Sequence, residues 1–302
     1  MLLVFGSLQQ GFIYALLALG IYISFRILNI PDLTAEGSFT FGLASSAVVT
    51  MAGHPVAALF VALAAGLTAG AVTGVIQTKL RVHPVLAGIL TMSGLYSINL
   101  LVMNKSSNVS LIGSDTVFKL IQNSMALSQD SAKLIVAVVI CLAVLALVII
   151  FFKTQIGLCI RATGDNEAMV SASSINVDAT KILALALSNA LIALSGGLLA
   201  QYQGFADINS GVGILVVGLA SVIIGEAFVG RRGVTAGFIS ALLGSIVYRF
   251  IVAAAINSSI FPAFLLKLVS AIIVAVALSL PTIKYHLERS KIKREALKNA
   301  GN

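Results

Sequence analysis

The sequence predicts an all-α polytopic membrane protein. Its 302 residues are 59% apolar and only 10% charged, and its mean hydropathy is +1.05. Soluble domains carry roughly 25% charged residues, so this composition excludes an ordinary soluble fold. Long apolar runs recur along the chain near the length of roughly 20 residues that crosses a bilayer as a helix. We therefore expect about nine transmembrane helices, with the amino terminus outside.

The predicted spans are joined by short polar connections. The first two cover residues 2–25 and 39–53, and the second of these is short for a full crossing. After the fourth span, residues 104–130 are rich in Ser and Asn and are expected outside, with a short surface helix near Val117–Met125. The remaining spans are residues 56–77, 85–103, 134–152, 182–203, 211–229, 234–256 and 261–280.

Basic residues indicate which ends of the spans face the cytoplasm. Lys79 and Arg81 follow the third span, Arg231 and Arg232 follow the seventh, and further basic residues gather in residues 284–302. Positive residues favour the cytoplasmic side, so the last segment is expected to be a cytoplasmic tail. A basic tail can also bind nucleic acid, but beside an apolar span it more often marks the inner side. Membrane lipid, and not nucleic acid, is therefore the expected partner.

One polar segment, residues 153–178, lies between two long apolar halves. This central segment carries helix signals, because Thr163 or Asp165 can cap an amino terminus and Glu167 then falls in the first turn. Its charges nearly balance, which favours docking of a protein over binding of lipid. We expect a short cytoplasmic surface helix, with an ordinary connecting loop as the alternative. The resulting division of the chain is 1–152, 153–178, 179–283 and 284–302.

A broken helix is predicted at residues 29–38, which contain Pro31 and a glycine between apolar runs. Proline removes a backbone donor, and the freed peptide groups need protein or water as partners. Interrupted helices at membrane depth often line transport sites. The alternative is that Asp32 and Glu36 lie at the aqueous interface and cap the next helix, with Arg26 as an ionic partner for either.

A faint internal repeat supports this arrangement. Pro31-Asp32-Leu33-Thr34 precedes Gly42-Leu43-Ala44-Ser45 in the first half. Ala206-Asp207-Ile208-Asn209 precedes Gly218-Leu219-Ala220-Ser221 in the second. The copies begin an odd number of predicted spans apart, so they would be inverted in the membrane. Many transporters are built from inverted repeats with the path between them.

Glycine recurs at every fourth position at Gly66, Gly70 and Gly74 in the third predicted span. This spacing leaves one face of a helix without side chains, so another helix can approach closely. Close packing is the favoured interpretation, and a pore lining is the alternative.

Charged residues inside the spans of the second half are few. Glu226 ends the seventh span near Arg231 and is expected to cap or pair there. Arg249 lies within an apolar helix. Because a buried ion in hydrocarbon is costly, this arginine is expected to face a partner, water or the headgroups.

No motif in this sequence indicates that the chain catalyses a reaction. The sequence has no Gly-x-x-x-x-Gly-Lys-Ser/Thr loop to cradle ATP, no His-Glu-x-x-His pair and no Gly-x-Ser-x-Gly elbow. His54, His83 and His286 lie far apart, and Cys141 and Cys159 do not suggest a disulfide framework. We predict no catalytic residue and no metal site. Energy for transport must then come from a partner or a gradient.

Two separated motifs resemble one known family. The stretch Asn29-Ile30-Pro31-Asp32-Leu33-Thr34-Ala35-Glu36-Gly37-Ser38-Phe39 comes first, and Gly157-Leu158 with Arg161-Ala162-Thr163-Gly164-Asp165-Asn166 follows. Together they look like the permease subunits of bacterial ATP-binding-cassette (ABC) importers, in the branched-chain amino-acid group, and the likeness covers nearly the whole chain. Ile30-Pro31-Asp32-Leu33-Thr34 departs from the commonest pattern of that group. It looks closer to a subgroup for aromatic or other hydrophobic amino acids, such as tryptophan or tyrosine.

The resemblance implies a set of partners and a location. A cytoplasmic ATP-binding subunit would bind ATP and Mg and hydrolyse the nucleotide, so this chain would need no cofactor. An extracellular or periplasmic binding protein would deliver the substrate, and a second permease copy or a paralogue would complete the membrane unit. The expected location is the bacterial cell (inner) membrane, multi-pass, with a cytoplasmic carboxyl terminus.

The resemblance also implies roles for particular residues. A coupling helix in the central segment would dock on the ATPase through Arg161, Thr163, Gly164, Asp165, Asn166, Glu167, Met169 and Val170. The broken helices would border the translocation path at Asn29, Pro31, Asp32, Thr34, Glu36, Asp207 and Asn209.

Other transport functions stay open at this point. Related permeases carry ribose and nucleosides, so a nucleoside or sugar permease is one alternative. A gradient-driven secondary transporter or channel would also explain an inverted repeat. It gives no reason, however, for a helical central segment of this composition.

Overall fold

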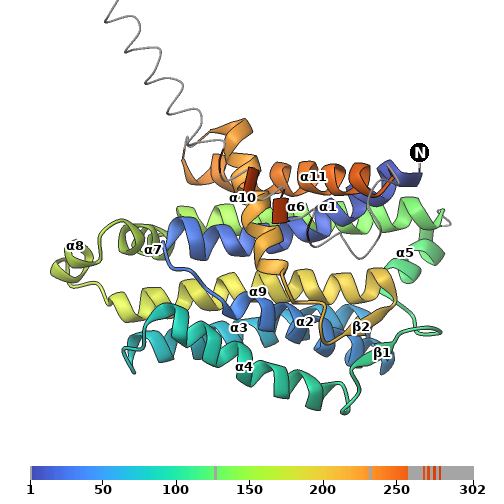
Figure 1. Ribbon diagram of the computed structural model, residues 1–302, viewed down its shortest axis with the longest axis horizontal. Coiled ribbons are helices and arrows are strands. Elements are labelled where there is room, and N and C mark those ends of the chain that lie inside the picture. The colour runs from blue at the N-terminus through green and yellow to red at the C-terminus, as the bar shows by residue number, and fades with distance from the viewer. Residues whose placement is uncertain are drawn as a thin grey trace, which may run out of the picture.

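The computed structural model describes residues 2–125, 128–230 and 233–257, with isolated positions between 268 and 279. The described residues form a bundle of helices with a two-stranded ribbon at one end (Figure 1). Arg231, Arg232 and the tail at 284–302 lie outside the described residues, as does the span predicted at 261–280 apart from those isolated positions.

Long helices are joined by loops, by shorter helices and by two short strands. α1 (Leu2–Ile21) continues directly into a π-helical turn, η1 (Tyr22–Ile27). The other helices are α2 (Thr34–Met51), α3 (Pro55–Thr78), α4 (Pro84–Val102), α5 (Val117–Met125), α6 (Gln129–Lys153), α7 (Gln155–Asp165), α8 (Glu167–Ala172), α9 (Val177–Gln203), α10 (Ile214–Val229) and α11 (Val234–Asn257). The strands are β1 (Asn108–Ser110) and β2 (Phe205–Asp207).

Six helices of the described residues are long and apolar enough to cross a membrane. They are Val4–Ile27, α3, α4, α6, α9 and α11. Two further helices are shorter, since α2 has 18 residues and α10 has 16. The all-α polytopic class is therefore confirmed, and the surface helix predicted at Val117–Met125 is present as α5. The count of about nine spans stays a prediction.

Helix α9 forms the centre of the bundle. In the most apolar 18-residue stretch of α9, 83% of the residues are buried, against 22% in the corresponding stretch of α6. Helix α3 packs along α9 with its glycine face, as predicted. A Cβ added at Gly74 would lie 2.7 Å from Ile182 Cα, and those at Gly66 and Gly70 would meet the backbone of α9. Only glycine permits so close an approach of the two helices.

The two ends of the bundle are distinct (Figure 1). One end carries α7 and α8 and is called the α8 end; the other carries α5 and the β1–β2 ribbon and is called the strand end. Gln9 lies near the start of α1, and its Nε2 donates to the Asp130 carbonyl oxygen over 2.8 Å. This bond lies at the strand end. Lys79, after α3, pairs with Asp178 at 2.7 Å at the α8 end. Helix α1 therefore begins at the end opposite the central segment.

The break predicted at residues 29–38 is shorter in the structure, because α2 already begins at Thr34. The chain leaves the helix after Ile27, passes through Asn29 with a left-handed φ of 54°, and starts α2 at Thr34. Asp32 is buried, and its side chain accepts from the Thr34 N–H at 2.9 Å and from Asn189 Nδ2 at 2.6 Å. Asn189 lies near the middle of α9. Asp32 thus accepts from the first N–H of α2 inside the bundle and not at an aqueous interface, and Leu33 is the N-cap residue, without a side-chain bond.

Helix α10 also starts inside the bundle. The backbone before α10 differs from the backbone before α2, because a glycine in the left-handed conformation, Gly213 (φ 83°), precedes the first residue of α10. The Gly213 N–H donates to Glu36 Oε1 at 3.0 Å. Glu36 belongs to the first turn of α2, so the amino-terminal ends of the two short helices meet.

Arg249 in α11 contacts two residues of α1. Its guanidinium carbon lies 3.5 Å from the centre of the Tyr14 ring, and Nη1 donates to Gln10 Oε1 at 3.3 Å. These contacts join α11 to α1 and give Arg249 a packing role.

Candidate functional site

The central segment folds into two helices, α7 and α8. The predicted caps, Thr163 and Asp165, are wrong, because α7 continues to Asp165. Asn166 is the cap of α8: its backbone is extended (φ −159°), and its Oδ1 accepts from the Met169 N–H at 3.0 Å. Thr163 instead lies buried inside α7 with its hydroxyl 2.9 Å from that of Thr180 on α9. Several adjacent polar residues of this segment can cap a helix. Asn166 does so because the helical backbone is interrupted at this residue.

The residues of α8 divide into an exposed and a buried face. The Met169 side chain is 57% exposed and Val170 only 2%. Glu167 pairs with Lys181 of α9 at 2.6 Å, which holds the start of α8 on the bundle. Met169 is therefore available to a partner, whereas Val170 contributes to packing within this chain.

Helix α7 contacts the backbone between η1 and α2. A Cβ at Gly164 would collide with the Ile27 carbonyl oxygen and would lie 3.0 Å from Leu28 Cα. Asn29 Nδ2 donates to the Gly164 carbonyl at 3.1 Å. The central segment is thus in backbone contact with the stretch that separates η1 from α2.

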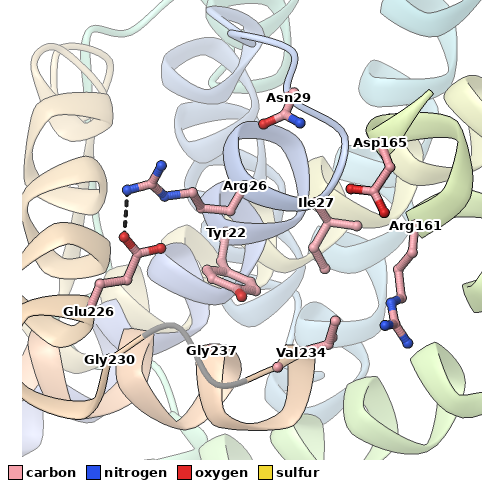
Figure 2. A pocket seen from close by; sticks show the side chains of 11 residues that line it. Tyr22, Arg26, Ile27, Asn29, Arg161, Asp165, Glu226, Gly230, Val234 and Gly237 are labelled. Atoms are coloured by element: carbon pink, nitrogen blue, oxygen red, sulfur yellow. Dashed lines mark hydrogen bonds and ion pairs between the residues drawn. The ribbon is translucent and has the colours of Figure 1, made fainter. Parts of the chain in front are cut away.

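A cavity of about 330 Å³ lies at the α8 end between these elements. Figure 2 shows Arg26 and Glu226 on one side of it and Arg161 and Asp165 of α7 on the other. Arg26 Nη2 and Glu226 Oε2 are 2.5 Å apart, and their side chains are 25% and 11% exposed. This ion pair joins the end of η1 to the end of α10.

One predicted pairing is corrected by this ion pair. Arg26 was expected to pair with Asp32 or Glu36, and it pairs with Glu226 instead. The cap or pair expected for Glu226 near Arg231 stays a prediction, because Arg231 lies outside the described residues. Asp32 is instead turned into the bundle toward Asn189. The partners Arg26 and Glu226 are 200 residues apart in the chain, and only the packing of η1 against α10 brings them together.

The residues predicted to border a path do not form one cluster. Asn29 lies at the α8 end against Gly164. Thr34 is buried, with its hydroxyl 2.8 Å from that of Thr73 on α3, and the neighbouring Pro31 is exposed. Asp207 and Asn209 lie at the end of β2, where the Asn209 N–H donates to Asp207 Oδ1 at 2.6 Å.

Glu36 alone of that set lines a second cavity, of about 340 Å³. Its walls come from the first turns of α2, from α4, and from the segment that leads into α10. Helix α4 supplies residues that our sequence analysis did not single out, above all Tyr96 and Asn99. A tyrosine and an asparagine within an apolar span were the signal that could have found them.

The fold and these sites define a class, a multi-pass membrane protein of the transport-permease type. The chain belongs to the family described as branched-chain amino acid transport system / permease component, whose model matches residues 3–281. It is thus the permease component of an ABC-type transporter, and this family's membrane component is not itself an ATPase. Among the described residues, no three His, Cys, Asp or Glu side chains gather as a metal site would require.

Curated relatives span several substrates. The chain is 35% identical over 291 residues to a tyrosine transport system permease protein of Clostridioides difficile, covering 96% of this chain and 95% of the relative. It is 28% identical over 250 residues to the ribose import permease protein RbsC of Escherichia coli K12, covering 82% and 75%. It is 24% identical over 260 residues to a probable branched-chain amino acid permease, LivH, of Methanocaldococcus jannaschii, covering 82% and 81%. No solved structure matches the chain significantly.

Proposed function

We propose that this chain is the membrane subunit of an importer that brings a hydrophobic amino acid, branched-chain or aromatic such as tyrosine or tryptophan, into the cell. ATP hydrolysis by a partner subunit drives the import. The observation that carries this proposal is the near full-length similarity to a tyrosine permease, at 35% identity over 96% of the chain. ATP and Mg belong to the partner, and this chain supplies no cofactor.

In this proposal the ATP-binding subunit docks on the α8 end. Met169 is the exposed apolar contact, and Asp165 and Glu167 flank it. The contact between Gly164 and Ile27 passes movement of α7 to the broken helix. Of the other proposed coupling residues, Asn166 caps α8, Thr163 and Val170 are buried, and Arg161 lines the first cavity.

The α8 end then faces the cytoplasm of a bacterial cell, and the carboxyl terminus lies on the same side of the cell (inner) membrane. The strand end faces outward and receives an extracellular or periplasmic substrate-binding protein. A second permease copy or a paralogue, with surrounding lipid, completes the membrane unit. The division at residues 153–178 and a total of about nine spans agree with this orientation.

We also propose that the two halves are inverted repeats. The support is a shared local structure: Asp32 accepts from the Thr34 N–H before α2, and Asp207 accepts from the Asn209 N–H before α10. Both short helices start inside the bundle, from opposite ends. The translocation path passes the meeting point of their amino-terminal ends at Glu36.

The ribose permease relative favours one alternative, an ABC permease for sugars or nucleosides. A gradient-driven secondary transporter is the other alternative. It would need no partner at the α8 end and leaves the exposed Met169 without a role.

Replacing Met169 with aspartate tests the proposed docking. We expect the ATP-binding subunit to be lost on co-purification, because a charge replaces an apolar side chain at the centre of the contact. A weakening of about 10-fold to 100-fold is the scale for a central apolar anchor in an interface. The measurement is the amount of ATP-binding subunit recovered per permease from membranes that contain both, and the ATPase rate of the recovered complex.

Ile112→Asp is the matched control. Ile112 is also an exposed apolar residue, at 92%, but it lies beyond the ribbon at the strand end. This control retains the ATP-binding subunit. Val170 is unsuitable as a probe because its replacement disturbs packing. Recovery of a full complement of ATP-binding subunit with Met169→Asp would contradict the docking assignment.

A further inference from the structure

A third cavity, of about 230 Å³, lies between α1 and α11, and we call it the Arg249 pocket. Figure 1 shows α11 along one edge of the bundle, with α1 beside it. The pocket is lined by Gly6, Ser7, Gln10, Arg249, Val252, Ala253 and Ile256. One guanidinium thus lies among apolar and uncharged polar side chains, and no carboxylate belongs to the described lining.

The Arg249 guanidinium has more donors than acceptors around it. Its Nη1 donates to Gln10 Oε1 at 3.3 Å, and its carbon atom lies 3.5 Å from the centre of the Tyr14 ring. Its Nε is buried and has no hydrogen-bond partner among the described residues. A guanidinium carries five N–H donors, and unpaired donors away from water are costly. The contacts with α1 therefore position the group without satisfying it.

The charge of Arg249 is not neutralised by a carboxylate of the described residues, because none of their ion pairs includes it. Outside that part of the chain, residues 258–287 contain no Asp or Glu, and Glu288 and Glu295 belong to the predicted cytoplasmic tail. Arginine stays protonated in proteins, and an aromatic ring face offers it only a partial negative charge. The chain thus leaves room for an anion from outside.

The depth of Arg249 indicates the kind of anion. Its partner Gln10 follows Gln9, whose Nε2 donates to the Asp130 carbonyl oxygen, and Asp130 lies in the first turn of α6. A charged first turn of a membrane-spanning helix lies at the headgroup level. Tyr14, the other contact of Arg249, is one helical turn deeper, about 6 Å along the helix. Arg249 thus lies within reach of the phosphate groups of lipids.

The surface around the pocket suits acyl chains. Helices α1 and α11 both belong to segments long and apolar enough to cross a membrane. Their side chains beside the pocket include Val4, 48% exposed, and Ile256, 49% exposed. A Cβ added at Gly6 would meet nothing within 4 Å, so the α1 wall leaves space near the guanidinium. Basic pockets between transmembrane helices are known to bind the headgroups of anionic lipids.

We infer that the Arg249 pocket binds the phosphate group of an anionic phospholipid, such as phosphatidylglycerol, whose acyl chains lie along α1 and α11. Arg249 donates charge-assisted hydrogen bonds to the phosphate oxygens, the geometry for which a guanidinium is suited. Gln10 holds the guanidinium in place. A zwitterionic lipid binds less well, because its own ammonium group competes for the phosphate. In the orientation proposed above, the lipid belongs to the outer leaflet.

Native mass spectrometry of the purified, delipidated complex tests the inference, with dioleoyl phosphatidylglycerol as the probe. The measured quantity is the apparent Kd of the tightest lipid-binding event per permease. We expect Arg249→Gln to weaken it by about 10-fold, the scale of lost hydrogen bonds to a charged group. Lys105→Gln is the matched control, because it removes one positive charge from an exposed turn outside the pocket. It should leave the Kd unchanged.

A second variant, Gly6→Leu, keeps Arg249 and fills the pocket instead. Because a Cβ there meets nothing within 4 Å, the helices need not move. It should weaken lipid binding by a similar factor. Gly94→Leu adds the same side chain at an equally open position of α4 and should bind the lipid normally. Excess inorganic phosphate and dioleoyl phosphatidylcholine should not displace phosphatidylglycerol from the wild-type complex.

Three results would overturn the inference. The first is an unchanged Kd in Arg249→Gln or, where that variant does not yield a folded complex, in Gly6→Leu. The second is displacement by inorganic phosphate, which would show an anion site open to water. The third is loss of a second permease copy from Arg249→Gln with lipid binding intact, which would assign the partner anion to that copy. None of these measurements requires transport, so failure of the proposed importer would leave their outcome unchanged.

Discussion

Replacing Gly164 with leucine should leave the ATP-binding subunit attached and lower ATP-driven transport by about 10-fold or more, within the usual range of coupling free energies between sites. The reason is steric, since even a Cβ at this position collides with the Ile27 carbonyl oxygen. The side chain must push α7 away from the broken helix. Docking through the exposed Met169 does not depend on that contact. Substrate uptake and ATPase rate are measured on the same reconstituted complex.

A graded series of substitutions separates the steric effect at Gly164 from the effect of losing the hydrogen bond to its carbonyl. Gly164→Ala should have a smaller effect of the same kind, and Asn29→Ala, which removes only the hydrogen bond to the Gly164 carbonyl, should have the smallest. Gln155→Leu adds the same side chain at an exposed position of α7 and should be neutral. Transport at the wild-type level with Gly164→Leu would show that the contact between α7 and the broken helix carries no coupling.

Replacing Gly70 with leucine should destabilise the whole bundle. A Cβ there would lie 2.8 Å from Ala186 Cα, and the Leu185 carbonyl oxygen is closer still. The obstacle is backbone, which cannot rotate away, so α3 and α9 must separate. Overpacking of a core costs about 1–3 kcal/mol, and more when backbone must move. Because a domain is stable by only about 5–15 kcal/mol, we expect a markedly lower yield of monodisperse protein and an earlier thermal transition in detergent.

The control for this replacement is Gly94→Leu. Gly94 is also a glycine inside an apolar helix, α4, but a Cβ there meets nothing within 4 Å. This variant should match the wild type in thermal stability. Equal stability of Gly70→Leu and Gly94→Leu would contradict the interpretation of the glycine face as a close-packing surface.

Features set by composition and local signals could be predicted from the sequence. The long apolar helices and the surface helix at Val117–Met125 follow from hydropathy, and Pro55 and Pro84 at the first turns of α3 and α4 mark where helices begin. The broken helix and the glycine face were also predictable, because proline and a four-residue glycine spacing each have one dominant structural meaning.

Features set by long-range packing could not be predicted. The partner of Arg26 is Glu226, 200 residues away, and nothing near either residue specifies it. The burial of Val170 beside the exposed Met169 depends on how α8 lies on the bundle. Asn99 was passed over because its span is apolar overall, and its place in the wall of the second cavity appears only when α4 is placed next to α2.

Uptake of labelled L-tyrosine into liposomes tests the central claim most directly. The liposomes contain this chain with its ATP-binding subunit, and the substrate-binding protein is added on the strand-end side. The proposed function predicts accumulation that requires ATP on the α8 side and that stops when the ATP-binding subunit is omitted. Accumulation by this chain alone, driven by an ion gradient and indifferent to ATP, would contradict it.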